Sequence, residues 1–111
     1  MSEDCLFCKI IKGEIPSEFL YEDDSFVVIK DINPKALVHL LIIPKKHIKS
    51  INELIEKDKD LVGQMIFLAK DLAQKQGIAE KGYRLTFNVG RGGGQLIDHL
   101  HLHLTGGGEI K

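Results

Sequence analysis

Three histidines alternate strictly with leucine in the run from Asp98 to Leu104. On a β-strand, side chains alternate between faces with period two, so His99, His101 and His103 would share one face of a sheet. Imidazole is partly neutral near pH 7 and can attack phosphorus to form a phospho- or nucleotidyl-histidine. Three neighbouring imidazoles can equally bind zinc. The spacing predicts a site and leaves a nucleophile and a metal both open.

A fourth histidine, His39, lies inside the most apolar stretch of the chain, residues 37–43. A buried polar ring costs about 1–3 kcal/mol unless it is hydrogen-bonded. A backbone carbonyl most often satisfies such a ring, which would give His39 a purely structural role. The histidine-rich segment offers a more informative partner, so we favour His39 as a group that orients the other histidines.

A glycine-rich segment, Asn88-Val89-Gly90-Arg91-Gly92-Gly93-Gly94-Gln95, precedes the histidines. Glycines let backbone N–H groups approach an anion closely, and the amides of Asn88 and Gln95 can donate hydrogen bonds to it. The segment is not a P-loop, because no Gly-Lys-Ser/Thr follows and the next element is a strand. Alone it would more often be a flexible hairpin connection. Its position before the histidines favours a phosphate-binding loop.

Cys5 and Cys8 form a Cys-x-x-Cys pair, which needs two further ligands to make a zinc site. His47 and His99 are candidates for those ligands. A redox pair is less favoured, because no strand precedes the motif as it would in a thioredoxin-like unit. Two unliganded thiols on a short helix are the remaining alternative, and we favour bound zinc.

The elements that position these residues follow from hydrophobic periodicity and turn residues. Residues 5–13 predict a short helix that Asp4 caps and Gly13 ends. Apolar residues at offsets of three and four, with Gly77 as the stop, predict one long helix over about residues 58–76. Ser50 is expected to cap a turn of helix before it. The expected strands span residues 19–22, 25–30, 37–43, 83–89 and 97–104, and residues 105–111 are expected to be loose. This order indicates an α+β domain with a largely antiparallel sheet.

Length and charge limit the class of protein. The chain has 111 residues, enough for one domain over residues 1–111, with 43% hydrophobic and 28% charged residues. A net charge of -1 argues against binding of polymeric nucleic acid but permits a small phosphorylated ligand. The start carries no apolar signal segment, and the longest apolar run is too short to cross a bilayer. We expect no membrane partner and a cytoplasmic location, where the cysteines are reduced or bound to metal.

Together, Asn88, the loop ending in Gly94-Gln95 and the pattern His99-x-His101-x-His103 resemble the signature of the histidine triad (HIT) superfamily. The resemblance covers nearly the whole chain and is greatest to the Hint branch. The other matching segments are Phe7-Cys8-Lys9-Ile10-Ile11, Glu14-Ile15-Pro16, Glu22-Asp23-Asp24, Asp31-Ile32-Asn33-Pro34, and His39 with Ile43-Pro44-Lys45-Lys46-His47-Ile48. The resemblance implies a HIT-like fold, with a five-stranded, mainly antiparallel sheet, one long helix and one short helix. It also implies hydrolysis of the P–N bond of purine nucleoside phosphoramidates.

The resemblance assigns roles to the polar residues. His101 would be the nucleophile that takes the nucleotidyl group, with His103 and His39 orienting it and His99 flanking it. Asp31 would bind the ribose hydroxyls. The α-phosphate would be held by Asn88 and by backbone N–H groups of Gly94, Gln95 and Leu96.

It also implies a base pocket, an assembly and a metal. The base would lie among apolar residues, namely Leu6, Phe7, Ile15, Ile29, Ile32 and Leu41. The family is usually homodimeric, with the long helix and the strand at residues 83–89 meeting their twins across a two-fold axis. Some bacterial relatives carry structural zinc, whose ligands here would be Cys5, Cys8, His47 and His99.

The sequence departs from the family pattern at Leu96, where relatives commonly have a serine that contacts the phosphate or leaving group. Loss of one positioned donor lowers a rate by up to about 10²–10³, which predicts slow turnover or a different leaving group. Relatives often end in a Trp-Pro-containing tail, whereas this sequence ends at Lys111. The alternatives are therefore a nucleotide sensor or interaction dimer with weak catalysis, a dinucleoside polyphosphate hydrolase as in the Fhit branch, and a protein whose main role is zinc binding.

Overall fold

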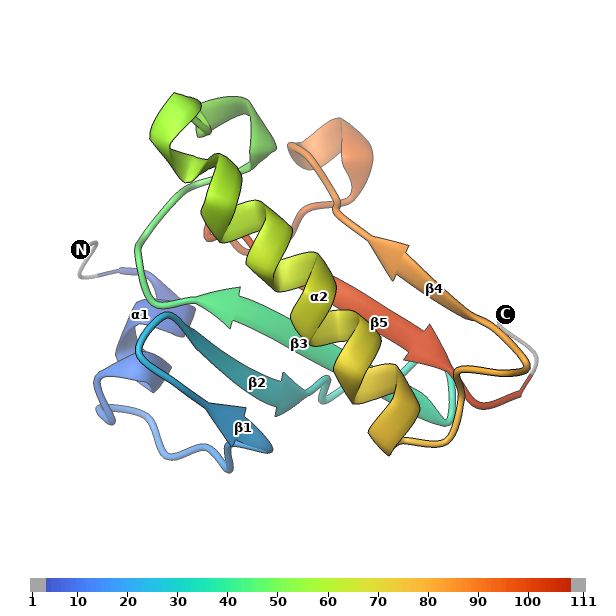
Figure 1. The fold of residues 1–111 in the computed structure, drawn as a ribbon. Coiled ribbons are helices and arrows are strands. Elements are labelled where there is room, and N and C mark those ends of the chain that lie inside the picture. The colour runs from blue at the N-terminus through green and yellow to red at the C-terminus, as the bar shows by residue number, and fades with distance from the viewer. Residues whose placement is uncertain (1–3, 109–111) are drawn as a thin grey trace.

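An antiparallel sheet of five strands carries the histidine-rich segment near its centre, with strand order β1-β2-β3-β5-β4 (Figure 1). The computed structural model describes residues 4–108. The strands are β1 (Tyr21–Glu22), β2 (Phe26–Lys30), β3 (Val38–Pro44), β4 (Tyr83–Thr86) and β5 (Leu102–Gly106). The helices are α1 (Leu6–Ile11) and α2 (Lys59–Lys75). The expected α+β class, with one long and one short helix, is confirmed.

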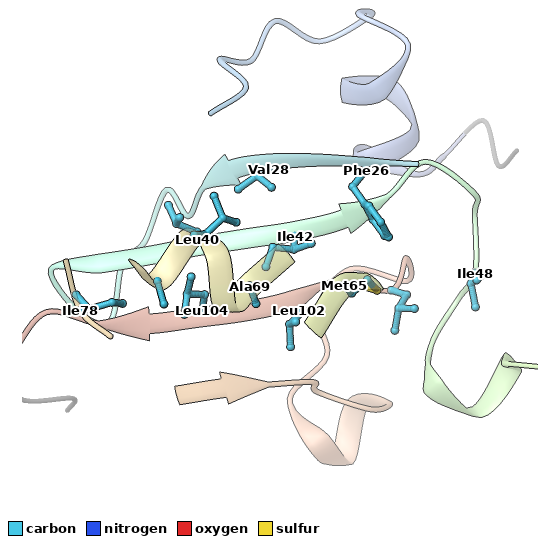
Figure 2. Close-up of a cluster of buried hydrophobic side chains, with 13 residues drawn as sticks. Phe26, Val28, Leu40, Ile42, Ile48, Met65, Ala69, Ile78, Leu102 and Leu104 are labelled. Atoms are coloured by element: carbon cyan, nitrogen blue, oxygen red, sulfur yellow. The ribbon is translucent and has the colours of Figure 1, made fainter. Parts of the chain in front are cut away.

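The central strand β3 is apolar along most of its length because both faces of the sheet are covered there. One face packs against α2 (Figure 2), through Val28, Leu40, Ile42, Leu102 and Leu104 with Met65 and Ala69. The other face packs against α1, through Val27, Ile29, Leu41 and Ile43 with Phe7, Cys8 and Ile10. In the register of β3 and β5, Leu41 lies opposite His103. The side chain of His103 therefore projects from the face that α1 covers.

Helix α2 is amphipathic, as its sequence predicts. Its buried residues are Met65, Ala69, Leu72 and Ala73. Just beyond it Gly77 has a φ of 75°, in the left-handed region that favours glycine. Ahead of it, Ser50 caps the short turn at residues 51–53 by accepting a hydrogen bond from the N–H of Asn52, as expected. No helix within residues 4–108 is long and apolar enough to span a membrane.

The histidine-rich strand is shorter than predicted, since β5 begins at Leu102 and leaves His99 and His101 ahead of it. The reason is Pro44, the last residue of β3. Continuing the register would place Pro44 opposite Leu100, but proline has no N–H to donate to a ladder. Leu100 instead donates its N–H to the carbonyl of Ile48, at 2.6 Å. The segment before β5 thus leaves the sheet, and His99 turns away from the strand pattern.

Other boundaries also need correction. The N-cap of α1 is Cys5 and not Asp4, and its sulfur accepts a hydrogen bond from the N–H of Cys8. Strand β4 ends at Thr86 and does not reach residue 89. Thr105 and Gly106, expected in a loose tail, belong to β5, because they pair with β3 and β4. The rest of that expected tail beyond residue 108 lies outside the described residues.

Candidate functional site

All five histidines of the chain gather where β3 and β5 meet. Two of them, His39 and His103, face each other with Nε2 and Nδ1 2.9 Å apart. Another two, His47 and His99, face each other with their Nδ1 atoms 3.1 Å apart. His101 lies between the pairs, with its ring centroid 5.0 Å from that of His103 and its Nδ1 2.7 Å from the carbonyl oxygen of His99. The structure thus places two histidine pairs on either side of one histidine.

The pair His47–His99 belongs to a cluster with both cysteines. Nδ1 of His99 lies 3.3 Å from Sγ of Cys5 and 3.5 Å from Sγ of Cys8. Nδ1 of His47 lies 3.2 Å from Sγ of Cys8. All four ligand atoms lie within 4.8 Å of one another. The four residues predicted as a metal site therefore do meet, although 94 positions separate Cys5 from His99.

The chemistry of this donor set fits a tetrahedral metal. Ligands at ordinary zinc–sulfur and zinc–nitrogen distances lie about 3.3–3.8 Å from one another, and the contacts here differ from that by a few tenths of an ångström. Nε2 of His99 donates its hydrogen to the carbonyl of Pro44 at 2.8 Å, which leaves a lone pair on Nδ1. Such a second hydrogen bond is usual for a metal-bound imidazole. Burial lowers the pKa of His99 to about 4, so its ring is neutral at pH 7.

His101 has one nitrogen engaged and one open. Its Nδ1 donates to the carbonyl of His99, so the lone pair lies on Nε2. His101 is 8% exposed. Its Nε2 has no hydrogen-bond partner within residues 4–108, whereas every fully buried side-chain nitrogen and oxygen there has one, so this atom keeps some access to solvent. Burial lowers the pKa of His101, which keeps the ring neutral. A neutral imidazole with an open lone pair is suited to nucleophilic attack.

The pair His39–His103 lies beside a carboxylate. Oδ2 of Asp31 is 3.3 Å from Nε2 of His39, and its Oδ1 accepts a hydrogen bond from the N–H of Asn33. Burial, assisted by the neighbouring histidines, lowers the pKa of His103 to about 4. Asp31, His39 and His103 also lie close enough to share an ion. The 2.9 Å between the two ring nitrogens is the ordinary length of a hydrogen bond, and we interpret this contact as one.

Hydrogen bonds from a buried side chain hold the glycine loop in place. Gln95 is buried, and its Oε1 accepts from the N–H of Gly90 while its Nε2 donates to the carbonyls of Lys49 and Ile97. Its amide is therefore fully engaged, and the expectation that it donates to an anion is wrong. The side chain instead holds the loop in place. Asn88 donates to the carbonyl of Gly93 at 2.8 Å.

The backbone at the end of this loop has the shape that the glycines predict. Gly94 has a φ of 84°, which a side chain would disfavour. Leu96 is 84% exposed. Arg91 closes the loop from outside by an ion pair with Asp98, at 3.0 Å. The N–H groups of Gly93, Gly94 and Gln95 donate to carbonyls within the loop. Among the described residues, the N–H of Leu96 and the second amide hydrogen of Asn88 are the donors left for an anion at this end of the loop.

The residues predicted to hold a base and ribose lie on the same face as His103. Ile29, Leu41 and His103 form one cross-strand row. Phe7 is buried and its ring packs edge-on against that of His101, with centroids 5.0 Å apart. The remaining predicted residues lie further out, with Leu6 41% exposed, Ile32 92% exposed and Ile15 partly buried. The structure brings Phe7, Ile29 and Leu41 together in one buried cluster and leaves Leu6 and Ile32 exposed.

Two hollows adjoin the cysteine–histidine cluster and the glycine loop. One, of about 480 Å³, is lined by residues that include Cys5, Leu6, His47 and Leu96. The other, of about 330 Å³, shares Lys49, Arg91 and Asp98 with the first. Neither is lined by His101 or His103, so both lie to the side of the open nitrogens.

Sequence reasoning missed the backbone acceptors that orient the rings, namely the carbonyls of Pro44 and His99. A backbone carbonyl has no sequence signature, since every residue carries one. The ion pair of Arg91 with Asp98 was also missed, because an exposed pair seven positions apart follows no regular spacing. The one available signal was Pro44 itself, whose missing N–H ends the strand and frees the next residues for the site.

Comparison with known proteins extends over nearly the whole chain. A family model described as "Scavenger mRNA decapping enzyme C-term binding" matches residues 4–108. The purine nucleoside phosphoramidase of Escherichia coli (strain K12) is 45% identical over 107 residues, which cover 96% of this chain and 90% of that protein. The crystal structure of a HIT family hydrolase from Legionella pneumophila has a TM-score of 0.94 and 51% identity, covering 97% of this chain and 96% of that one. A HIT family hydrolase from Clostridium thermocellum also has a TM-score of 0.94, with 49% identity and coverage of 100% and 96%.

Proposed function

Because the chain belongs to the histidine triad family, we propose that it is a nucleotide hydrolase that cleaves the P–N bond of purine nucleoside phosphoramidates. The observation that carries this proposal is the state of His101. Its ring is neutral, its Nδ1–H is held by the His99 carbonyl, and its Nε2 lone pair is open to solvent. The likeness to a purine nucleoside phosphoramidase supplies the substrate class.

In the proposed reaction, the lone pair on Nε2 of His101 attacks the α-phosphorus. The P–N bond breaks, and its electron pair goes to the leaving nitrogen, which takes a proton from solvent and departs as an amine. Water then attacks the phosphorus of the nucleotidyl-histidine, and the electron pair of the breaking P–Nε2 bond returns to His101. The proton that this water releases replaces the one taken from solvent, so one water is consumed in each cycle. Splitting the displacement into two steps is the advantage of covalent catalysis.

We place the nucleotide along the face that carries His103. The backbone N–H of Leu96, with the amide of Asn88, holds the phosphate against His101, since the N–H of Gly94 donates to the carbonyl of Arg91. The Asp31 carboxylate accepts hydrogen bonds from the ribose hydroxyls, for which it is a strong acceptor. The purine packs against the apolar row of Ile29 and Leu41, with Leu6, Phe7, Ile15 and Ile32 around it.

The cysteine–histidine cluster is proposed to hold structural zinc through Cys5, Cys8, His47 and His99. Bound there, zinc would supply a fixed tetrahedral anchor between the start of α1 and the segment before β5, and no step of the reaction passes through it. The carbonyl of His99 holds His101, so this anchor would also support the nucleophile. A cytoplasmic location, where thiols stay reduced, is consistent with such ligands.

We also propose a homodimer, as is usual in the family. β4 lies at one edge of the sheet, so its outer side is open for pairing with a second copy. On the outer face of α2, Phe67 is 67% exposed and Ile66 is 39% exposed. An exposed strand edge beside exposed apolar side chains favours self-association through these elements, and we expect no membrane or polymeric nucleic acid as partner.

The test is intact-mass analysis after mixing with an adenosine phosphoramidate. We expect a nucleotidyl adduct on the wild type and release of AMP, with both lost in His101→Ala. Turnover that persists in His101→Ala would reject His101 as the nucleophile. A wild type without turnover would reject the proposed activity.

A second candidate function, nucleotide binding with weak or no hydrolysis, is favoured by Leu96, whose exposed apolar side chain offers no hydroxyl to the phosphate. Tight binding of AMP or GMP beside negligible turnover would identify this case. Hydrolysis of dinucleoside polyphosphates in preference to phosphoramidates would identify the other enzyme class.

A further inference from the structure

We propose that the backbone N–H of Lys35, acting through His39, sets the tautomer of His103, so that His103 presents an N–H and not a lone pair to the substrate phosphate. The chemical purpose of this arrangement rests on the proposed function, whereas the tautomers themselves do not. Lys35 would then be a positioning residue, acting by its backbone from the loop between β2 and β3.

The first step is the environment of His39. The backbone nitrogen of Lys35 lies 3.0 Å from Nδ1 of His39. A backbone N–H can only donate, so Nδ1 of His39 must carry the lone pair. The neutral ring then has its hydrogen on Nε2. The loop is held for this contact because Asp31 donates its N–H to the carbonyl of His39, also at 3.0 Å.

The second step is the contact between the two rings. The Nε2–H of His39 faces two acceptors, Nδ1 of His103 at 2.9 Å and Oδ2 of Asp31 at 3.3 Å. The nearer acceptor is the ring nitrogen, so Nδ1 of His103 carries a lone pair. The groups that face His103 are His39 on β3, His101 beside it and Asp31 on the loop after β2. A doubly protonated His103 would turn an N–H toward the N–H of His39, so the arrangement requires the neutral ring with its hydrogen on Nε2.

The third step is the surface that the substrate meets. Nε2 of His103 has no hydrogen-bond partner within the described chain. Because every fully buried side-chain nitrogen there has such a partner, this atom keeps access to solvent. Nε2 of His101 is open in the same way but carries a lone pair. The two rings, with centroids 5.0 Å apart, therefore offer a nucleophile and a hydrogen-bond donor side by side. The opposite tautomer of His103 would place a second lone pair against the phosphoryl oxygens and repel them.

The direct test is nitrogen-15 NMR of the histidine rings in the protein without substrate. We expect His39 and His103 of the wild type to carry their hydrogen on Nε2 and His101 on Nδ1. Lys35→Ala keeps the backbone N–H and should give the same pattern, whereas Lys35→Pro removes it and should give mixed tautomers at His39 and His103. Hydrogen on Nδ1 of His103 in the wild type would overturn the proposal, and so would unchanged tautomers in a folded Lys35→Pro variant.

A second test does not depend on whether Lys35→Pro folds. In His39→Gln the amide oxygen replaces the Nδ1 acceptor and the amide NH₂ replaces the Nε2–H donor, whereas His39→Leu offers neither. We expect His39→Leu to lower kcat by about 10²-fold, as for loss of one positioned donor, and His39→Gln to recover most of that loss at unchanged KM. Equal kcat in the two variants would overturn the role of the hydrogen bond. If the wild type shows no turnover, the proposed function fails, and the NMR pattern still decides the tautomers.

Discussion

The two histidine pairs have nearly the same separation but opposite chemistry. In His47–His99, two Nδ1 atoms face each other at 3.1 Å, and the lone pair of His99 also meets two sulfurs. In His39–His103, an Nε2 faces an Nδ1 at 2.9 Å, as donor and acceptor. The first pair suits a cation, and the second is already a complete hydrogen bond. Distance alone therefore does not distinguish a metal site from a hydrogen bond, because backbone groups at Pro44 and Lys35 decide which nitrogen holds the hydrogen.

The largest expected effect is on the metal pair. Protein purified without chelator should contain one zinc per chain, and removal of zinc should lower the free energy of unfolding by about 4 kcal/mol or more, the value for a ligand present at a thousand times its Kd. Thermal unfolding with and without chelator measures this. Cys8→Ser is the control, because its stability should no longer respond to chelator. A metal-free wild type of full stability would contradict the zinc proposal.

One substitution in each pair should show that zinc binding and catalysis depend on different histidines. His47→Ala should lose zinc but still form the nucleotidyl adduct, slowed by less than about tenfold. His103→Ala should keep zinc while kcat falls by about 10²–10³-fold, equivalent to ~3–4 kcal/mol in the barrier. Elemental analysis and single-turnover kinetics measure the two properties. Loss of zinc from His103→Ala would show that the pairs are not independent.

Asp31 borders only the hydrogen-bonded pair and offers a smaller effect. Asp31→Asn should raise KM about tenfold, because it removes a charge-assisted acceptor of the ribose hydroxyls, worth about 1.5 kcal/mol. Steady-state kinetics with adenosine phosphoramidate measure it. A fall in kcat at constant KM would instead indicate that Asp31 acts on His39 and not on the ribose.

The last effect concerns the pH dependence of stability. The pKa of His103 is lowered from 6.5 to about 4 in the folded protein, so between these values the unfolded chain binds more protons. Stability should therefore fall as pH drops from 6.5 toward 4, with His103 contributing at most about 1 kcal/mol per pH unit after allowance for its partial exposure. Urea unfolding at several pH values should give a shallower dependence for His103→Asn. Equal slopes would mean that the ring is not held neutral by the fold.

The sequence predicted the elements well because each rests on local pattern. The offsets of apolar residues located α2, and Gly77 stopped it. The apolar run at residues 37–43 predicted a strand, and the structure covers it on both faces. The alternation of histidine and leucine suggested one long strand, but β5 begins only at Leu102. Alternation describes which face a side chain would take if the ladder continued, and Pro44 on the neighbouring strand prevents that.

The sequence predicted which residues belong to the site better than it predicted how their side chains are arranged. Cys5, Cys8, His47 and His99 were grouped from residue type and family resemblance, and the structure does bring them together. The division of the histidines into a pair suited to a metal and a hydrogen-bonded pair was not predictable, because it depends on backbone groups without sequence signature. Gln95 shows the same limit, since its amide braces the loop and does not face an anion.

The cysteine–histidine cluster joins residues 94 positions apart along the chain. Closing a loop of that length costs about 4 kcal/mol of chain entropy, a cost that is already met once the sheet has formed. During synthesis, Cys5 and Cys8 leave the ribosome long before His99 does. A metal captured by all four residues would therefore fasten a sheet that has already formed. Metal binding by all four residues would then follow folding and would not initiate folding.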